Sequence, residues 1–110
     1  MATRQGNRTG RVIDPAVDAP VVESVALDGG TYRVEFTASA SLDTEIAFAL
    51  VRAGAPRDLV PAFVGVGLAQ WTFTGPVQEG DKFAVVNKST GLRIVVGSVT
   101  WQCVGVLGGL

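Results

Sequence analysis

A strict alternation of apolar and polar side chains runs through residues 31–38, and it says more clearly than any other stretch which way a strand must face. Its apolar phase consists of Tyr32, Val34, Phe36 and Ala38. Because successive side chains of a strand point to opposite faces, the pattern predicts an antiparallel strand with one buried and one wet face. Residues 28–30, Asp-Gly-Gly, predict a tight turn before it, in which glycine supplies positive φ angles.

The rest of the chain also consists of strand-like segments. Short apolar segments alternate with turn residues at intervals of about ten residues, as expected of an all-β sandwich or barrel. We expect about eight strands, at residues 21–27, 31–38, 44–52, 59–66, 69–74, 82–87, 92–96 and 99–107. The sixth and seventh of these should form a hairpin around a turn at 88–91. Pro61 cannot donate a ladder hydrogen bond, so its segment should be either a strand at a sheet edge or the irregular start of a strand.

Residues 1–20 differ from the remainder because they are polar and rich in glycine and arginine, with prolines that favour extended geometry. We interpret them as an extended N-terminal arm, followed by a β-sandwich domain at 21–107 and a flexible end at 108–110. Residues 1–10 are either a tail without a role or an arm that lies on a neighbouring subunit. In the second case the candidate partner-binding residues are Arg4, Arg8, Arg11, Val12 and Ile13.

The overall charge excludes one class of partner. The formal net charge is −1, so we expect no bulk attraction to nucleic acid or to an anionic membrane, although a local contact of the arm arginines with nucleic acid is a further alternative. Apolar residues make up 47% of 110 residues, which is high for so small a domain. This content indicates apolar surface that is covered by a partner, and therefore an oligomer.

The chain contains no histidine and a single cysteine, Cys103. A disulfide within the chain is therefore excluded, and the usual general base and commonest transition-metal ligand are missing. Residues 1–8 carry no apolar run of the secretory type, and no window reaches the ~18 apolar residues of a membrane span. We expect a soluble product made in the cytoplasm, or one that has been processed before this numbering begins.

Acidic side chains are the remaining candidates for catalysis. Glu23, Glu35, Glu45 and Asp81 are the possible paired carboxylates. Each falls at a turn or on the polar phase of a strand, so we interpret them as solvated and predict no enzymatic activity and no cofactor. A calcium site would need Asp28, Asp43, Asp58 and Asp81 to converge, but no acidic loop has ligand spacing.

Two tryptophans and the cysteine allow a binding role or a core role. Trp71 and Trp101 could stack on a sugar ring, but both lie on apolar phases beside Phe73 and Val99, which favours the core. Cys103 also lies on an apolar phase and is interpreted as a small buried hydrophobic residue.

Two segments carry a family resemblance. In residues 28–37 a glycine and tyrosine open the alternating strand, and in residues 77–87 a Gly80-Asp81 turn precedes an apolar strand and the closing strand. Together they resemble the jelly rolls of tumour necrosis factor and of the complement globular heads, above all their compact bacterial and phage versions. The resemblance covers roughly residues 21–107. The chain departs from the larger members by lacking their long first strands.

The resemblance implies a homotrimer that packs apolar strand faces about a threefold axis. It also implies a phage capsid decoration, or cement, protein that binds the major capsid protein of the outer shell and reinforces it. Such a protein would be made in the host cytoplasm and located on the virion. The alternative is a recognition module for glycans or host surfaces, such as a tail, fibre or cell-surface head domain.

Overall fold

The computed structural model describes residues 4–64 and 68–106, and their secondary structure consists of eight β-strands. The strands are β1 (Gln5–Ile13), β2 (Pro20–Glu23), β3 (Gly30–Ala40), β4 (Thr44–Arg52), β5 (Ala55–Val64), β6 (Ala69–Val77), β7 (Lys82–Asn87) and β8 (Ile94–Val106). No helix in these residues is long and apolar enough to cross a membrane.

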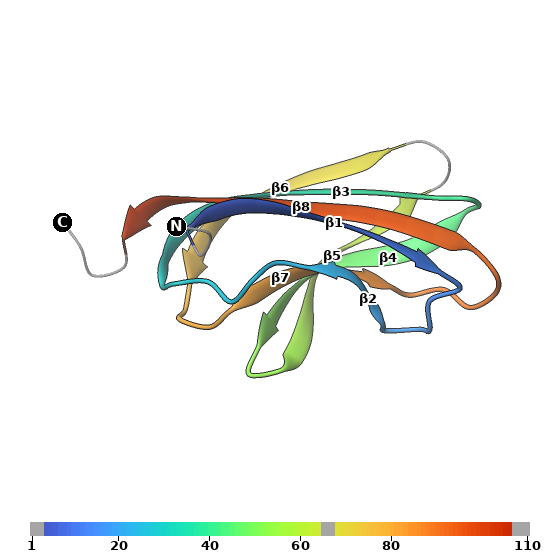
Figure 1. Ribbon diagram of the computed structural model, residues 1–110, viewed down its shortest axis with the longest axis horizontal. Coiled ribbons are helices and arrows are strands. Elements are labelled where there is room, and N and C mark those ends of the chain that lie inside the picture. The colour runs from blue at the N-terminus through green and yellow to red at the C-terminus, as the bar shows by residue number, and fades with distance from the viewer. Residues whose placement is uncertain (1–3, 65–67, 107–110) are drawn as a thin grey trace.

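The strands form two antiparallel sheets that stack face to face (Figure 1). The first sheet has the order β1-β8-β3-β6 and the second has the order β2-β7-β4-β5. Consecutive strands alternate between the sheets except for β4 and β5, which form a hairpin within the second sheet. This is the jelly-roll arrangement, and it confirms the predicted all-β antiparallel sandwich.

The prediction for β3 is confirmed side chain by side chain. Tyr32, Val34 and Phe36 are fully buried, whereas Arg33 and Glu35 are exposed. β3 lies between β8 and β6, so both its backbone edges are paired. Its register therefore decides which face of the whole first sheet is apolar.

Aromatic rings fill the space between the sheets. Phe36 of the first sheet stacks on Phe48 of the second at a centroid distance of 5.0 Å, and it meets Phe83 edge-on at 5.8 Å. Trp71 stacks on both Phe36 and Phe48, at 5.7 and 6.2 Å. Because aromatic pairs of this geometry add to the free energy of burial, this cluster is the centre of the core.

The prediction of a free arm is wrong for Gln5–Ile13. This segment is β1, an edge strand of the first sheet that pairs with β8 along its whole length. Its glycines have a structural cause. A Cβ at Gly10 would lie 2.2 Å from the carbonyl oxygen of Val21, and one at Gly6 would lie 2.6 Å from Cζ2 of Trp101. Glycine there reflects close packing rather than disorder.

Two predictions about turns are also wrong. Residues 28–30 do not supply the positive φ angles that the predicted tight turn needs, since the described glycines with positive φ are Gly54, Gly80 and Gly91. Gly30 is instead a buried strand residue whose Cβ would lie 2.7 Å from the carbonyl oxygen of Gly105. β7 and β8 lie in different sheets, so they form no hairpin.

The ends of the predicted strands shift in the structure. β8 runs without interruption through Gly97. The glycine there allows close packing of the two sheets, because a Cβ would meet the side chain of Val85 in the opposite sheet at 3.1 Å. β5 begins at Ala55, within the segment expected to be a loop. Pro61 lies on β5 at the edge of the second sheet, as predicted.

One ion pair, between an exposed arginine and a buried carboxylate, connects β4 to the turn before β7. Arg52 donates from Nε to Oδ1 of Asp81 at 3.0 Å and from a terminal nitrogen to Oδ2 at 2.8 Å, and the backbone N–H of Gln78 also donates to Oδ2. Asp81 is almost fully buried, so its interpretation as a solvated group is wrong. The hydrogen bonds from Arg52 are the main cause that lowers the pKa of the Asp81 carboxyl, against the opposing effect of burial.

Replacing Gly10 tests the integration of β1. Gly10→Ala should lower the free energy of unfolding by about 1–3 kcal/mol, because the new methyl group can be accommodated only if β1 moves away from β2. Urea denaturation measures the loss. Thr9→Ala is the control, since Thr9 is exposed and next to Gly10, and it should change stability by about 0.5 kcal/mol or less. Equal stability of the two variants would contradict the packing of β1 on the domain.

Replacing Asp81 tests the ion pair and its pH dependence. Asp81→Asn should lower the free energy of unfolding at pH 7 by about 1–3 kcal/mol, because the amide cannot accept both Arg52 bonds. A carboxyl whose pKa is lower in the folded state stabilises the protein above its unfolded-state pKa of about 3.9. The difference from wild type should therefore shrink as the pH falls below about 4.

Denaturant titrations between pH 7 and pH 2.5 measure this difference. Asp43→Asn is the matched control, because Asp43 is exposed and Arg93 donates to its backbone oxygen rather than to its carboxylate. A stability difference between wild type and Asp81→Asn that stays constant with pH would show that the carboxylate charge is not what stabilises the turn.

Candidate functional site

The outward side of the first sheet is a continuous polar surface. The register places three rows of side chains across its four strands. The rows are Gln5, Gln102, Arg33 and Thr74; Asn7, Thr100, Glu35 and Thr72; and Thr9, Ser98, Thr37 and Gln70. All are exposed or half-buried, and we call this set the polar face.

Hydrogen bonds between strands hold parts of the polar face in place. Asn7 donates from Nδ2 to Oγ1 of Thr100 at 2.5 Å. Arg33 donates to Oε1 of Gln102 at 3.3 Å, and the hydroxyl groups of Thr37 and Ser98 also bond to each other. Each amide and hydroxyl keeps further donor or acceptor capacity that points to solvent. The face is therefore an ordered array of hydrogen-bonding groups.

A shallow depression of about 490 Å³ lies over β1 and β8. It is lined by Gln5, Gly6, Asn7, Thr100, Trp101 and Gln102. The absence of a side chain at Gly6 leaves room for the ring of Trp101, whose Cζ2 lies 2.6 Å from where a Cβ would be. The depression is thus bordered by amide and hydroxyl groups of the polar face, while the Trp101 ring packs against Gly6 on the core side and is only 3% exposed.

The two tryptophans are core residues, as the sequence favoured. Trp101 is 3% exposed, and Trp71 is half-buried within the aromatic cluster. Among the residues whose side chains the structure describes, no aromatic side chain is exposed. A sugar-stacking platform of exposed tryptophan is therefore not present in that part of the chain.

The structure distributes the arginines of the predicted arm along one strand edge. Arg4 forms an ion pair with Asp28 at 3.4 Å, within the same chain. Arg8 and Arg11 are exposed and form no ion pair with another described residue. Their role toward a partner remains a prediction.

The candidate carboxylates Glu23, Glu35 and Glu45 lie on three different strands, β2, β3 and β4. Glu23 is half-buried, and Glu35 and Glu45 are exposed. No three histidine, cysteine or acidic residues among residues 4–64 and 68–106 lie in a position to hold a metal ion. Cys103 is only half-buried, contrary to its interpretation as a buried residue, and its thiol donates to the carbonyl oxygen of Gly105 at 3.2 Å.

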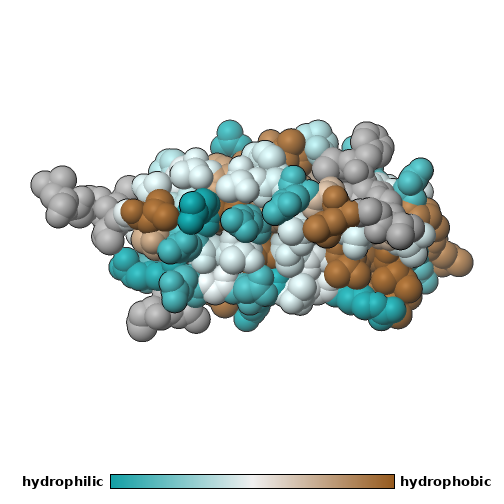
Figure 2. All heavy atoms as spheres, turned by 90° about the horizontal axis from the view of Figure 1, so that it is seen from above, coloured by the Kyte–Doolittle hydropathy of each residue, from teal (hydrophilic) through white to brown (hydrophobic). Residues whose placement is uncertain are grey.

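Large apolar side chains gather at one end of the sandwich. This apolar end consists of Ile13, Val17, Leu42, Leu68 and Leu92, all of which are exposed. The register brings them together, because the end of β1 lies beside the start of β8, which lies beside the end of β3. Figure 2 shows apolar atoms concentrated at the right-hand end of the molecule.

Arg93 connects the loops of the apolar end. Its side chain donates to the backbone oxygen of Asp43 at 3.0 Å and to Oγ1 of Thr44 at 2.9 Å, and it also bonds the oxygen of Thr90. Its backbone N–H donates to Oδ1 of Asp14 at 2.8 Å. The loops that carry Ile13, Leu42 and Leu92 are therefore fixed relative to one another. Nothing in the local sequence around Arg93 indicates this role, because its partners are distant in the chain.

Comparison with solved structures places the fold among jelly rolls. The globular domain of zebrafish complement 1qA protein superposes with a TM-score of 0.59 and 10% identity, over 87% of this chain and 96% of that one. Eiger TNF from S. frugiperda superposes with a TM-score of 0.60 and 13% identity, over 88% of this chain and 92% of that one. The fold is thus that of the complement and tumour necrosis factor jelly rolls, as the sequence resemblance implied.

A second group of similar structures consists of carbohydrate-binding modules. The N-terminal cellulose-binding domain of Cellulomonas fimi β-1,4-glucanase C superposes with a TM-score of 0.56 and 18% identity, over 84% of this chain and 76% of that one. At such identities the likeness concerns the fold alone. No family model matches the sequence, and a search of curated proteins also found no match.

Proposed function

We propose that this chain is a non-enzymatic recognition module that binds a glycan on its polar face. The observation that carries the proposal is the ordered array of amide and hydroxyl groups beside the depression over β1 and β8. The presence of carbohydrate-binding modules among the structures of similar fold supports it. This is the alternative function drawn from the sequence, now attached to a particular surface.

The chemistry of the polar face suits a ligand rich in hydroxyl groups. Amide side chains such as Asn7 and Gln102 both donate and accept hydrogen bonds, as sugar hydroxyls do. A flat sheet face lets an extended oligosaccharide contact several rows at once. Because no described aromatic side chain is exposed for stacking, the affinity rests on hydrogen bonds that compete with water. We therefore expect a weak interaction, with a Kd of about 1 mM for a short oligosaccharide.

Titration with cellohexaose, followed by backbone amide NMR shifts, tests the proposal. The shifted amides should lie on β1 and β8 around the depression. Asn7→Ala and Thr100→Ala should each weaken binding by about threefold to tenfold, because each removes a hydrogen-bonding group. Thr90→Ala is the matched control, since Thr90 is exposed in the loop between β7 and β8 at the opposite end of the first sheet.

A glycan array with the same variants extends the test to other sugars. Binding that is equally affected by Thr90→Ala and Thr100→Ala would show that the polar face is not the site. The absence of any carbohydrate ligand on the array, with a folded protein, would remove the proposal.

The apolar end favours a second candidate, the structural virion protein inferred from the sequence. In this proposal the chain is a homotrimeric capsid decoration subunit that attaches to a larger shell through exposed side chains such as Leu92 and Ile13. Because β1 is part of the first sheet, the N-terminal segment is not available as an extended arm. In this proposal the subunit therefore attaches to the shell through the apolar end, whose loops Arg93 connects.

Native mass spectrometry of the isolated chain tests the oligomeric part of this candidate. A homotrimer should give about three times the chain mass of 11.4 kDa. Leu92→Ser should then weaken attachment to capsids, whereas Val104→Ser should not, since Val104 is exposed on the last strand far from the apolar end. A stable monomer at micromolar concentration would contradict the trimer.

A further inference from the structure

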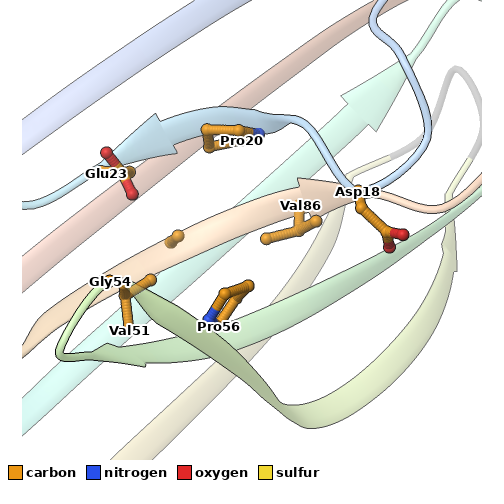
Figure 3. A pocket seen from close by; sticks show the side chains of 8 residues that line it. Asp18, Pro20, Glu23, Val51, Gly54, Pro56 and Val86 are labelled. Atoms are coloured by element: carbon orange, nitrogen blue, oxygen red, sulfur yellow. The ribbon is translucent and has the colours of Figure 1, made fainter.

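A second hollow lies on the outward side of the other sheet, away from the polar face. It is a groove of about 290 Å³ between β2 and the β4–β5 hairpin, with β7 as its floor (Figure 3). It is lined by Asp18, Pro20, Glu23, Val51, Gly54, Pro56, Ala84 and Val86. The volume suits one long side chain and its neighbours rather than a larger ligand, since small-molecule pockets usually have volumes of about 300 Å³ or more.

The walls and floor of the groove are apolar. Pro20 and Pro56 stand on opposite sides, and proline has no backbone N–H to offer a ligand. Ala84 and Val86 of β7 form the floor, and Val51 borders it from β4. These surfaces can cover an aliphatic chain but give it no polar contact.

The polar side chains of the lining are both carboxylates. Figure 3 shows Glu23 and Asp18 at opposite ends of the groove. An ionised carboxylate only accepts hydrogen bonds, so the lining side chains select a ligand that donates them. Anions are disfavoured for the same reason, and the ligand that complements this groove has a cationic head on an apolar stem.

The two carboxylates differ in their availability. Oδ1 of Asp18 accepts from Nζ of Lys88 at 2.7 Å, and Lys88 also contacts Asp58 at 3.1 Å, so this end of the groove is tied to β5. Glu23 forms no ion pair with a described residue. The nearby cation on β7, Lys82, lies two positions before Ala84 and does not form an ion pair with Glu23. Glu23 is therefore the carboxylate that can anchor an incoming cation.

We propose that this groove binds a basic side chain, arginine or lysine, of a partner polypeptide. The aliphatic stem lies between Pro20 and Pro56 on the floor of β7, and the guanidinium or ammonium group donates to Glu23. The site is separate from the polar face, so it does not depend on the proposed glycan binding.

Amide NMR titration with the peptide acetyl-Gly-Arg-Gly-amide tests this site, with acetyl-Gly-Gln-Gly-amide as the uncharged comparison. The arginine peptide should shift the amides of Ala84 and Val86, and the glutamine peptide should not. Glu23→Gln should weaken binding by about tenfold or more, because it removes the charged acceptor. Glu45→Gln is the matched control, since it makes the same change at an exposed carboxylate outside the groove.

Three results would overturn the proposal. One is an arginine peptide that shifts no groove amide, with Glu23→Gln folded as wild type by the same spectra. Another is equal binding by Glu23→Gln and Glu45→Gln. The third is a set of groove shifts that depends on protein concentration without peptide, which would assign the groove to a second copy of this chain instead.

Discussion

The burial of one side of β3 is the constraint on which the rest of the structure depends. Phe36 lies against Phe48 and Phe83 of the opposite sheet, and a shift of β3 by one residue would turn all its apolar side chains to water. Because β8 and β6 pair with β3 residue by residue, they inherit its facing. The same alternation places the polar side chains of these strands on the outward side of the sheet, where they form the polar face.

The facing of the strands could be predicted from the sequence, but their pairing could not. Alternation is a local property, so the buried set headed by Tyr32 followed directly from residues 31–38. The order β1-β8-β3-β6 depends on contacts between residues far apart in the chain. The supposed hairpin between β7 and β8 failed for this reason: a short turn-like linker is compatible with a crossing between sheets.

The candidate sites were harder to predict than the core, because each is assembled from several strands. Composition made residues 1–20 look like an extended arm, yet Gly6 and Gly10 are glycine because Trp101 and the backbone of Val21 leave no room for a side chain. Asp81 was misread for a related reason. A carboxylate in a turn is usually solvated, and only the folded structure brings Arg52 to it. The polar rows of the first sheet likewise exist only once the strand order is known.

The outward faces of the two sheets differ in what they offer a partner. The first sheet presents amides and hydroxyls that both donate and accept, with Arg33 and Glu35 of opposite charge on the same strand. The second sheet carries a groove lined by small apolar residues and by Asp18 and Glu23, so its lining side chains accept hydrogen bonds but do not donate them. A neutral, hydroxyl-rich ligand matches the first surface and a cation with an apolar stem matches the second. Under the two proposals the ligands would occupy opposite faces of the sandwich and would not compete, so one domain could connect a glycan to a protein partner.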